Sequence, residues 1–296
     1  MVDEDTIRSA CSSLLRRVGG NRLEIAHFTV QKYLQNIDAG DLKIGIFKIN
    51  EMKANAALAG ACLTYLCLPD FDKHPPATLQ ESDAQNGLYP IFQHAARSWV
   101  DYAIRNSWQD EKVLCLSRRL FTPKKTYNFI AFCLEYVVYS PDGSTTPESS
   151  WRGFVDKIAS GGLRPLHIAS MMHLSTMCQY LIDEGSDVNQ ESGLGTPLKF
   201  AINDDFTLFW PKSDNIPRYK VDYRGLYDTI TVLIAAGATC QLHNSERNYL
   251  LSLLILSADP GESKIFRYLL ESGMQIRSDL LSWLQLKDRE TNERFF

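Results

Sequence analysis

The sequence lacks several features that define membrane and secreted proteins. No apolar run reaches the roughly 18 residues needed to span a bilayer. The first ten residues, MVDEDTIRSA, are acidic and polar, unlike a secretory signal. The seven cysteines include no Cys-x-x-Cys pair and are scattered, as expected for reduced core thiols. These absences predict a cytoplasmic chain with no membrane partner, and a disulfide framework is the less favoured alternative.

Motifs for common catalytic chemistry are also absent. There is no G-x-x-x-x-G-K-[ST] loop to hold phosphates, and the dipeptide Gly-Lys never occurs. No G-x-S-x-G turn is present to hold a nucleophilic serine. Cys62 and Cys67 are five residues apart, and His167 and His173 are six apart, so neither pair shares a helical face as metal ligands would. We therefore expect no enzyme activity, no catalytic residue, no cofactor and no metal.

The composition is that of a folded protein. Of the 296 residues, 45% are hydrophobic and 22% are charged, enough for a packed core in two or three domains. The net charge of −4 argues against a general nucleic-acid surface. A small basic cluster at Arg118-Arg119 and Lys124-Lys125 could contact phosphate, but we favour a solvated helix end.

A repeated motif occupies the second half of the chain. In residues 161–189 a tight turn precedes Pro165-Leu166-His167, two short helices are predicted, and Gly185 follows the second. The opening recurs as Thr196-Pro197-Leu198, 32 residues after the first, and the ending recurs at Gly237 and Gly273. This order and spacing resemble ankyrin repeats. The residues that carry the resemblance are Pro165, Leu166, His167, Ala169, Gly185, Thr196, Pro197, Leu198, Ala201, Gly237 and Gly273.

Physical roles follow for these residues. Proline suits the first position of a helix because its missing N–H would have no partner there. The three glycines are predicted to end second helices in a left-handed conformation. Ankyrin repeats usually open with a Thr and a His that hydrogen-bond the turns together. Here the first repeat has His167 but Arg164 in the Thr position, and the second has Thr196 but Lys199 in the His position. We expect the preceding helical domain to cover the first repeat.

The predicted array is irregular. Gly185 and Gly237 are 52 residues apart, about 19 more than one ankyrin period. We assign the excess to an insertion at 203–225, between the two helices of the second repeat. Its aromatic residues are either partner contacts or a cover for the array: Phe206, Phe209, Trp210, Tyr219 and Tyr223.

The first 45 residues predict a helix, a hairpin and a second helix. Residues 3–15 have apolar residues at helical spacing, and Gly19-Gly20-Asn21 predicts a turn between strands at 15–18 and 22–28. His27 is assigned to the second strand. Thr29 is the expected N-cap of the next helix, with Val30, Tyr33, Leu34 and Ile37 on its apolar side.

Residues 47–139 are predicted to be helical. One apolar stripe comprises Leu58, Ala61, Cys62, Tyr65 and Leu66, and a second comprises Phe92, Ala95, Ala96, Trp99 and Ala103. A loop is expected at 69–87, and 127–139 is a buried helix or, alternatively, a strand. Residues 140–150, SPDGSTTPESS, predict a linker, followed by a short amphipathic piece at 151–158.

A second resemblance lies in the N-terminal half. Residues 23–34, LEIAHFTVQKYL, resemble the AHFSVKEYL signature of fungal NACHT–ankyrin proteins, which are NLR-like STAND ATPases. Residues 61–66, and residues 88–91 together with 95–99, resemble the helical segment that follows there. The resemblance implies the part of such a protein after its nucleotide-binding module, because the phosphate-binding loop is missing here.

Together these patterns predict a mainly α protein that acts as a non-catalytic protein–protein interaction module. The partner surface would be the concave face, the turn tips and the insertion of the ankyrin array. The helix, hairpin and helix predicted in the first 45 residues form the tail of a winged-helix unit. The alternatives are therefore a nucleic-acid-binding regulator that acts through this winged helix, or a partner subunit of a separate ATPase. The predicted domains are a winged-helix-like remnant at 1–45, a helical linker domain at 46–139, a linker and short helix at 140–159, and about three ankyrin repeats with a closing helix at 160–296.

Overall fold

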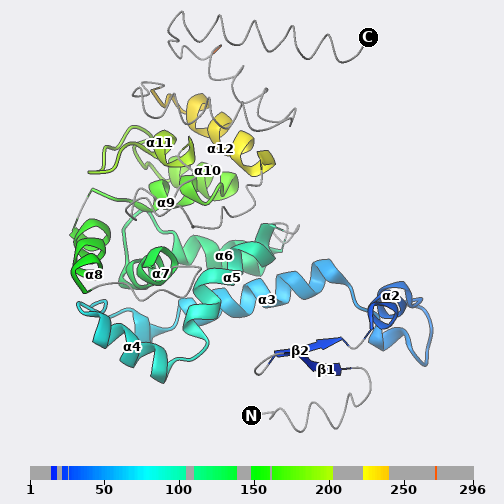
Figure 1. Ribbon diagram of the computed structural model, residues 1–296. Coiled ribbons are helices and arrows are strands. Elements are labelled where there is room, and N and C mark those ends of the chain that lie inside the picture. The colour runs from blue at the N-terminus through cyan, green and yellow to red at the C-terminus, as the bar shows by residue number, and fades with distance from the viewer. Residues whose placement is uncertain are drawn as a thin grey trace, which may run out of the picture.

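The computed structural model describes residues 15–18, 22–25, 27–104, 110–138, 148–160, 162–202, 223–239 and 271. These residues are mainly helical, as predicted, with one two-stranded hairpin near the N-terminus (Figure 1). The predicted helix at 3–15 falls outside the described residues except for Leu15, which belongs to a strand. The third repeat and the closing helix also fall outside them, apart from residues 239 and 271.

The hairpin and the first helix follow the predicted order. Strand β1 (Leu15–Val18) pairs antiparallel with β2 (Arg22–Ile25). Helix α2 (Phe28–Asn36) begins one residue before Thr29, so the predicted N-cap is wrong. His27 holds that position instead: its backbone is extended and its Nδ1 accepts a hydrogen bond from the Thr29 N–H at 3.2 Å. His27 is therefore a helix cap and not a strand residue.

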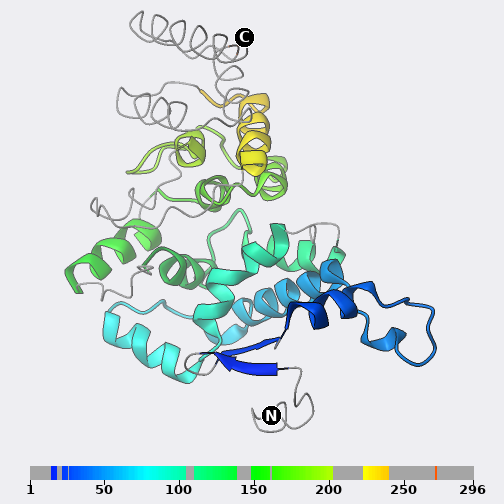
Figure 2. The same cartoon turned by 45° about the vertical axis from the view of Figure 1, so that its right-hand side comes forward.

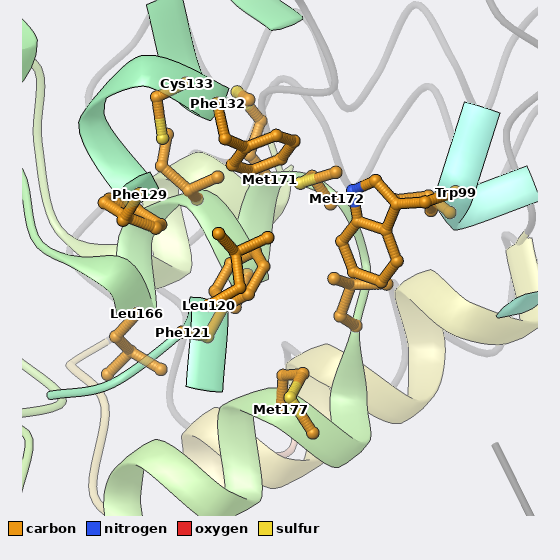
Figure 3. Packing of buried hydrophobic residues seen from close by; sticks show 14 of the residues in the cluster. Trp99, Leu120, Phe121, Phe129, Phe132, Cys133, Leu166, Met171, Met172 and Met177 are labelled. Atoms are coloured by element: carbon orange, nitrogen blue, oxygen red, sulfur yellow. The ribbon is translucent and has the colours of Figure 1, made fainter. Parts of the chain in front are cut away.

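The middle of the chain forms a helical layer. It contains α3 (Glu51–Leu66), the short η3 (Pro69–Phe71), α4 (Leu79–Leu88), α5 (Phe92–Ile104), α6 (Glu111–Leu120) and α7 (Tyr127–Val138). Helix α3 packs along α5 and against α6, and α7 packs on α5. Aromatic rings fill the space between them: Trp99, Phe121, Phe129 and Phe132 are fully buried neighbours (Figure 3).

Two sequence predictions in this layer need correction. The stripe on α5 is buried throughout, but on α3 Leu58 is 45% exposed and Ala61 is exposed, whereas Ala59 and Leu63 are buried. The stripe is rotated because α3 contacts two helices, α5 and α6, and not one. The expected loop at 69–87 contains η3 and most of α4, which starts at a Thr78 N-cap.

Helix pairs form the second half of the described chain. Helix α8 (Glu148–Val155) continues into a π-helical turn, η5 (Asp156–Ser160), so the last three residues of the predicted linker are helical. The first pair is α9 (Pro165–Met171) with α10 (Ser175–Asp183), and the second is α11 (Pro197–Ile202) with α12 (Tyr223–Ala235). Helix α9 packs on α11 and α10 packs on α12, so the pairs are stacked (Figure 2).

The two halves share one hydrophobic core. Met171 and Met172, at the end of α9, lie between the rings of Phe132 and Trp99 (Figure 3). All four side chains are buried, and α6 also contacts α10. The middle helices thus cover the first helix pair, as the sequence led us to expect.

Candidate protein-binding surface

His167 joins the first helix pair to the turn that follows it. Its Nδ1 accepts a hydrogen bond from the Arg164 N–H at 3.1 Å, and its Nε2 is 2.9 Å from the Gln190 carbonyl oxygen. The first contact requires an unprotonated Nδ1. The proton is therefore on Nε2, and the Nε2–H donates a hydrogen bond to the Gln190 carbonyl. The ring is fully buried, and burial lowers its pKa to about 4. His167 is therefore neutral at physiological pH.

Successive turns approach one another closely. A Cβ on Gly162 would lie 2.8 Å from the Glu191 carbonyl oxygen, so only glycine fits between these turns. Ser192 and Gly195 exchange backbone hydrogen bonds of 3.1 and 3.0 Å, and Gly195 has a φ of +125°. The segment Gly193–Gly195 is a turn, and it leads directly into α11.

The predicted glycines end their helices in a left-handed conformation. Gly185 follows α10 with a φ of +87°, and Gly237 follows α12 with a φ of +92°. The Ser186 N–H donates to the Leu181 carbonyl at 2.9 Å and the Gly185 N–H donates to the Ile182 carbonyl at 2.9 Å, which is the Schellman motif. Gly273 lies outside the described residues.

Helix α9 ends in the same way without a glycine. His173 has a φ of +54°, and the Leu174 N–H donates to the Ala169 carbonyl at 2.9 Å. The His173 ring bridges to the second pair, with Nε2 at 3.1 Å from the Ala201 carbonyl oxygen. No sequence pattern predicted this role for His173. Histidine is among the few non-glycine residues enriched in this conformation, but the sequence gives no other signal of it.

Asn189 connects the loop after α10 to the loop after α12. Its Nδ2 donates to the Gly237 carbonyl at 3.0 Å, and its Oδ1 accepts from the Thr239 N–H at 2.8 Å. The amide nitrogen and the amide oxygen of Asn189 therefore both hydrogen-bond to residues about 50 positions later in the sequence. The sequence did not predict this contact either, because an isolated Asn in a loop predicts only a turn.

The remaining predicted motif residues occupy the stacked helices. Pro165 and Pro197 stand at the first positions of α9 and α11, as predicted. The apolar motif residues are buried: Leu166, Ala169, Leu198 and Ala201. The Thr196 hydroxyl accepts a long hydrogen bond, 3.4 Å, from the Lys199 N–H.

The predicted insertion is described only at its end. Phe206, Phe209, Trp210 and Tyr219 lie outside the described residues, so their assignment as partner contacts stays a prediction. Tyr223 is the first residue of α12, so the last three residues of the predicted segment 203–225 are helical. The insertion boundary at 225 is therefore too late.

An open groove lies over α6, α10 and α12. Its volume is about 550 Å³. Two carboxylates, one aromatic ring, one guanidinium and several hydroxyl and amide groups line it: Arg118, Ser175, Thr176, Gln179, Tyr180, Asp183, Asp228, Thr231 and Val232. This mixture offers donors, acceptors and an apolar ring to a peptide, but no paired nucleophile and base.

Three of the four residues in the basic cluster, which the sequence predicts at a solvated helix end, contact other parts of the protein. The Arg118 guanidinium lies over the Tyr180 ring, 5.1 Å from its centroid. Arg119 donates to the Cys67 carbonyl at 3.4 Å. The Lys125 ammonium donates to the Ile158 and Leu163 carbonyls at 2.6 and 3.2 Å. Arg118, Arg119 and Lys124 are exposed, and the two arginines lie in the last turn of α6, so the solvated-end interpretation is wrong only for the half-buried Lys125.

The described thiols and acids do not form a reactive centre. Burial raises the pKa of Cys67 to about 11 and that of Cys178 to about 12, so both stay protonated. Burial also raises the pKa of Glu135, whose carboxylate is held by Arg97 and Asn86 inside the helical layer. Within the described ranges, no group of three His, Cys, Asp or Glu side chains is placed to hold a metal ion.

Comparisons with protein-family models, curated proteins and solved structures found no significant match for this chain. Among the described residues, no helix combines the length and apolar character needed to cross a bilayer.

Proposed function

We propose that the chain is a non-catalytic, cytoplasmic protein-interaction module whose second half is a short ankyrin array. The observation that carries this proposal is the buried His167 bridge between the start of one helix pair and the turn before the next. Stacking of α9 on α11 and of α10 on α12 supports it, as do the left-handed glycines at the helix ends. Each pair has an apolar side that only a neighbour covers, which is the principle of a repeat array.

The N-terminal half supports a related proposal. A hairpin followed by α2 carries the sequence that resembles the NACHT–ankyrin signature. The middle helices then join this segment to the helix pairs through the shared core. In this proposal residues 1–45 are a winged-helix-like remnant, and the chain contributes the sensing or scaffold part of an NLR-like protein.

The groove over α6, α10 and α12 is the surface on which we place the partner. Asp183 and Asp228 are both exposed, and Tyr180 offers a ring face that already accommodates a guanidinium from Arg118. Basic and aromatic side chains of a protein segment suit these groups. Repeat arrays bind extended surfaces of partners, so several such contacts would act together.

Affinity capture with the full chain tests the proposal. The variant Asp183→Lys/Asp228→Lys reverses the charge of the groove, and Asp72→Lys/Asp83→Lys makes the same charge change at exposed positions outside the groove. We expect the wild type and the control to retain a protein that the groove variant loses. Hydrogen exchange of the complex should show protection in α10 and α12. A captured protein that protects neither helix, or binds all three chains equally, would contradict the groove assignment.

A further inference from the structure

A second surface, near the N-terminus, carries an unusual number of exposed apolar side chains. Leu42 is 100% exposed, Ile46 81% and Phe47 59%, all in the loop between α2 and α3. Phe28 and Tyr33 on α2 are exposed to a similar degree. We call these five residues the α2-loop surface. Exposed apolar side chains that gather in one short stretch often mark an interaction site.

Within the part of the chain that the structure describes, the packing of the fold does not use these side chains. Helix α2 has no buried residue, and of residues 27–50 only Ile37 is buried. Figure 1 shows α2 and its loop at the edge of the molecule, and in Figure 2 the loop after α2 projects outward from the helical layer. The apolar side chains therefore face water in this structure. Their burial against a partner would recover hydrophobic free energy that folding leaves unused.

Hydrogen bonds from its backbone N–H groups nevertheless hold the loop in one conformation in this structure. The Asp41 carboxylate accepts from the Lys43 and Ile44 N–H groups at 2.7 and 3.1 Å. The Ile49 N–H donates to the Leu34 carbonyl at 2.9 Å, which ties the loop to α2. A Cβ on Gly45 would lie 2.8 Å from the Ala39 carbonyl oxygen, so the turn is tight. The apolar side chains are presented by an ordered loop, which lowers the entropy lost on binding.

Charges of both signs surround the α2-loop surface. Lys32, Lys43 and Lys48 are exposed, and so are Asp38 and Asp41. In a twofold dimer each copy presents the same patch, so a surface needs complementary charges within itself. An anionic lipid surface would instead favour lysines without interspersed acids. We propose that the α2-loop surface is the twofold interface between two copies of this chain.

Sedimentation of the full chain over a range of concentrations tests this. The wild type should show a monomer–dimer equilibrium, and Ile46→Ser/Phe47→Ser should weaken dimerisation at least about ten-fold, since central apolar contacts dominate interfaces. Leu88→Ser is the matched control, because Leu88 is 78% exposed on α4, away from this surface. It should leave the dimer unchanged. Circular dichroism of each variant checks that the fold is kept.

Reversing the charge of two lysines tests the proposed dimer independently. Lys43→Glu/Lys48→Glu places acids opposite acids and should weaken the dimer, with a smaller difference at high salt. A wild type that stays monomeric up to the highest soluble concentration would overturn the proposal. So would a monomer that binds vesicles containing phosphatidylserine, or a dimer that survives both double variants. The groove variants above leave this surface intact, so failure of one proposal is distinguishable from failure of the other.

Discussion

At the scale of single residues, the neutral ring of His167 should make stability depend on pH. Its pKa is about 4 in the folded chain, against about 6.5 for an exposed histidine. The unfolded chain therefore binds the proton more readily between these values, and stability present above pH 6.5 falls as the pH drops toward 4. We expect a loss of about 2 kcal/mol between pH 7 and pH 5 from this group.

Urea denaturation of the full chain at these two pH values measures the loss. His94→Gln is the control, because His94 is exposed, and it should keep the pH dependence. His167→Gln should be less stable at pH 7 and should lack most of the slope between pH 7 and 5. An unchanged slope in that variant would show that another group is responsible.

The incomplete Thr–His openings offer a second residue-scale prediction. Arg164 precedes α9 in an extended conformation, with φ −120° and ψ 162°, which suits a capping threonine. Arg164→Thr should therefore stabilise the chain by about 0.5–1 kcal/mol through a hydroxyl bond to the first turn of α9. Arg164→Ala removes the same side chain without supplying a hydroxyl and should give no gain. Denaturation midpoints of the two variants decide between them.

At the scale of elements, the ends of the helices determine how the pairs connect. Gly185 and Gly237 have left-handed φ values, and no atom lies within 4 Å of a Cβ built on either. The cost of Gly185→Ala is therefore conformational and not steric, about 1 kcal/mol. Gly193→Ala is the control: its site is equally open and its φ is not left-handed, so it should be neutral. A neutral Gly185→Ala would contradict the need for a left-handed residue after α10.

Element prediction succeeded where one local rule controlled the outcome. Pro165 and Pro197 begin helices because proline suits that position, and the α5 stripe is buried because α5 shows one apolar face. It failed where tertiary contacts intervened, as for Leu58 on α3, which packs against two helices. Helix α4 was missed although Thr78-x-x-Glu81 is a capping pattern that the sequence displays.

The candidate surfaces were less predictable than the elements. The groove combines Arg118 from α6 with residues of α10 and α12, and no local pattern brings these three helices together. The α2-loop surface was missed for a different reason. Tyr33 belongs to a helical pattern that predicts burial, whereas Leu42, Ile46 and Phe47 lie in the loop after α2, where no periodic pattern marks them as buried or exposed.

At the scale of the whole molecule, the shared core predicts that the middle helices and the helix pairs unfold together. Lys125 strengthens the connection, because its half-buried ammonium donates to the Ile158 and Leu163 carbonyls just before α9. Lys125→Met keeps much of the apolar stem but removes both donors, which should cost about 1–3 kcal/mol. Lys124→Met changes the charge equally at an exposed neighbour and should cost little.

Hydrogen exchange shows whether Lys125 couples the middle helices to the helix pairs or only stabilises the chain in general. In Lys125→Met, amides of α9 and α10 should exchange faster relative to those of α5 and α7, because the link before α9 is broken while the middle core is intact. In the wild type, the amides of α9 and α10 and those of α5 and α7 should all be among the slowest to exchange. Equal acceleration in all four helices would mean that Lys125 stabilises the chain without joining its halves. The covering of the first helix pair would then depend on Met171, Met172 and their aromatic neighbours alone.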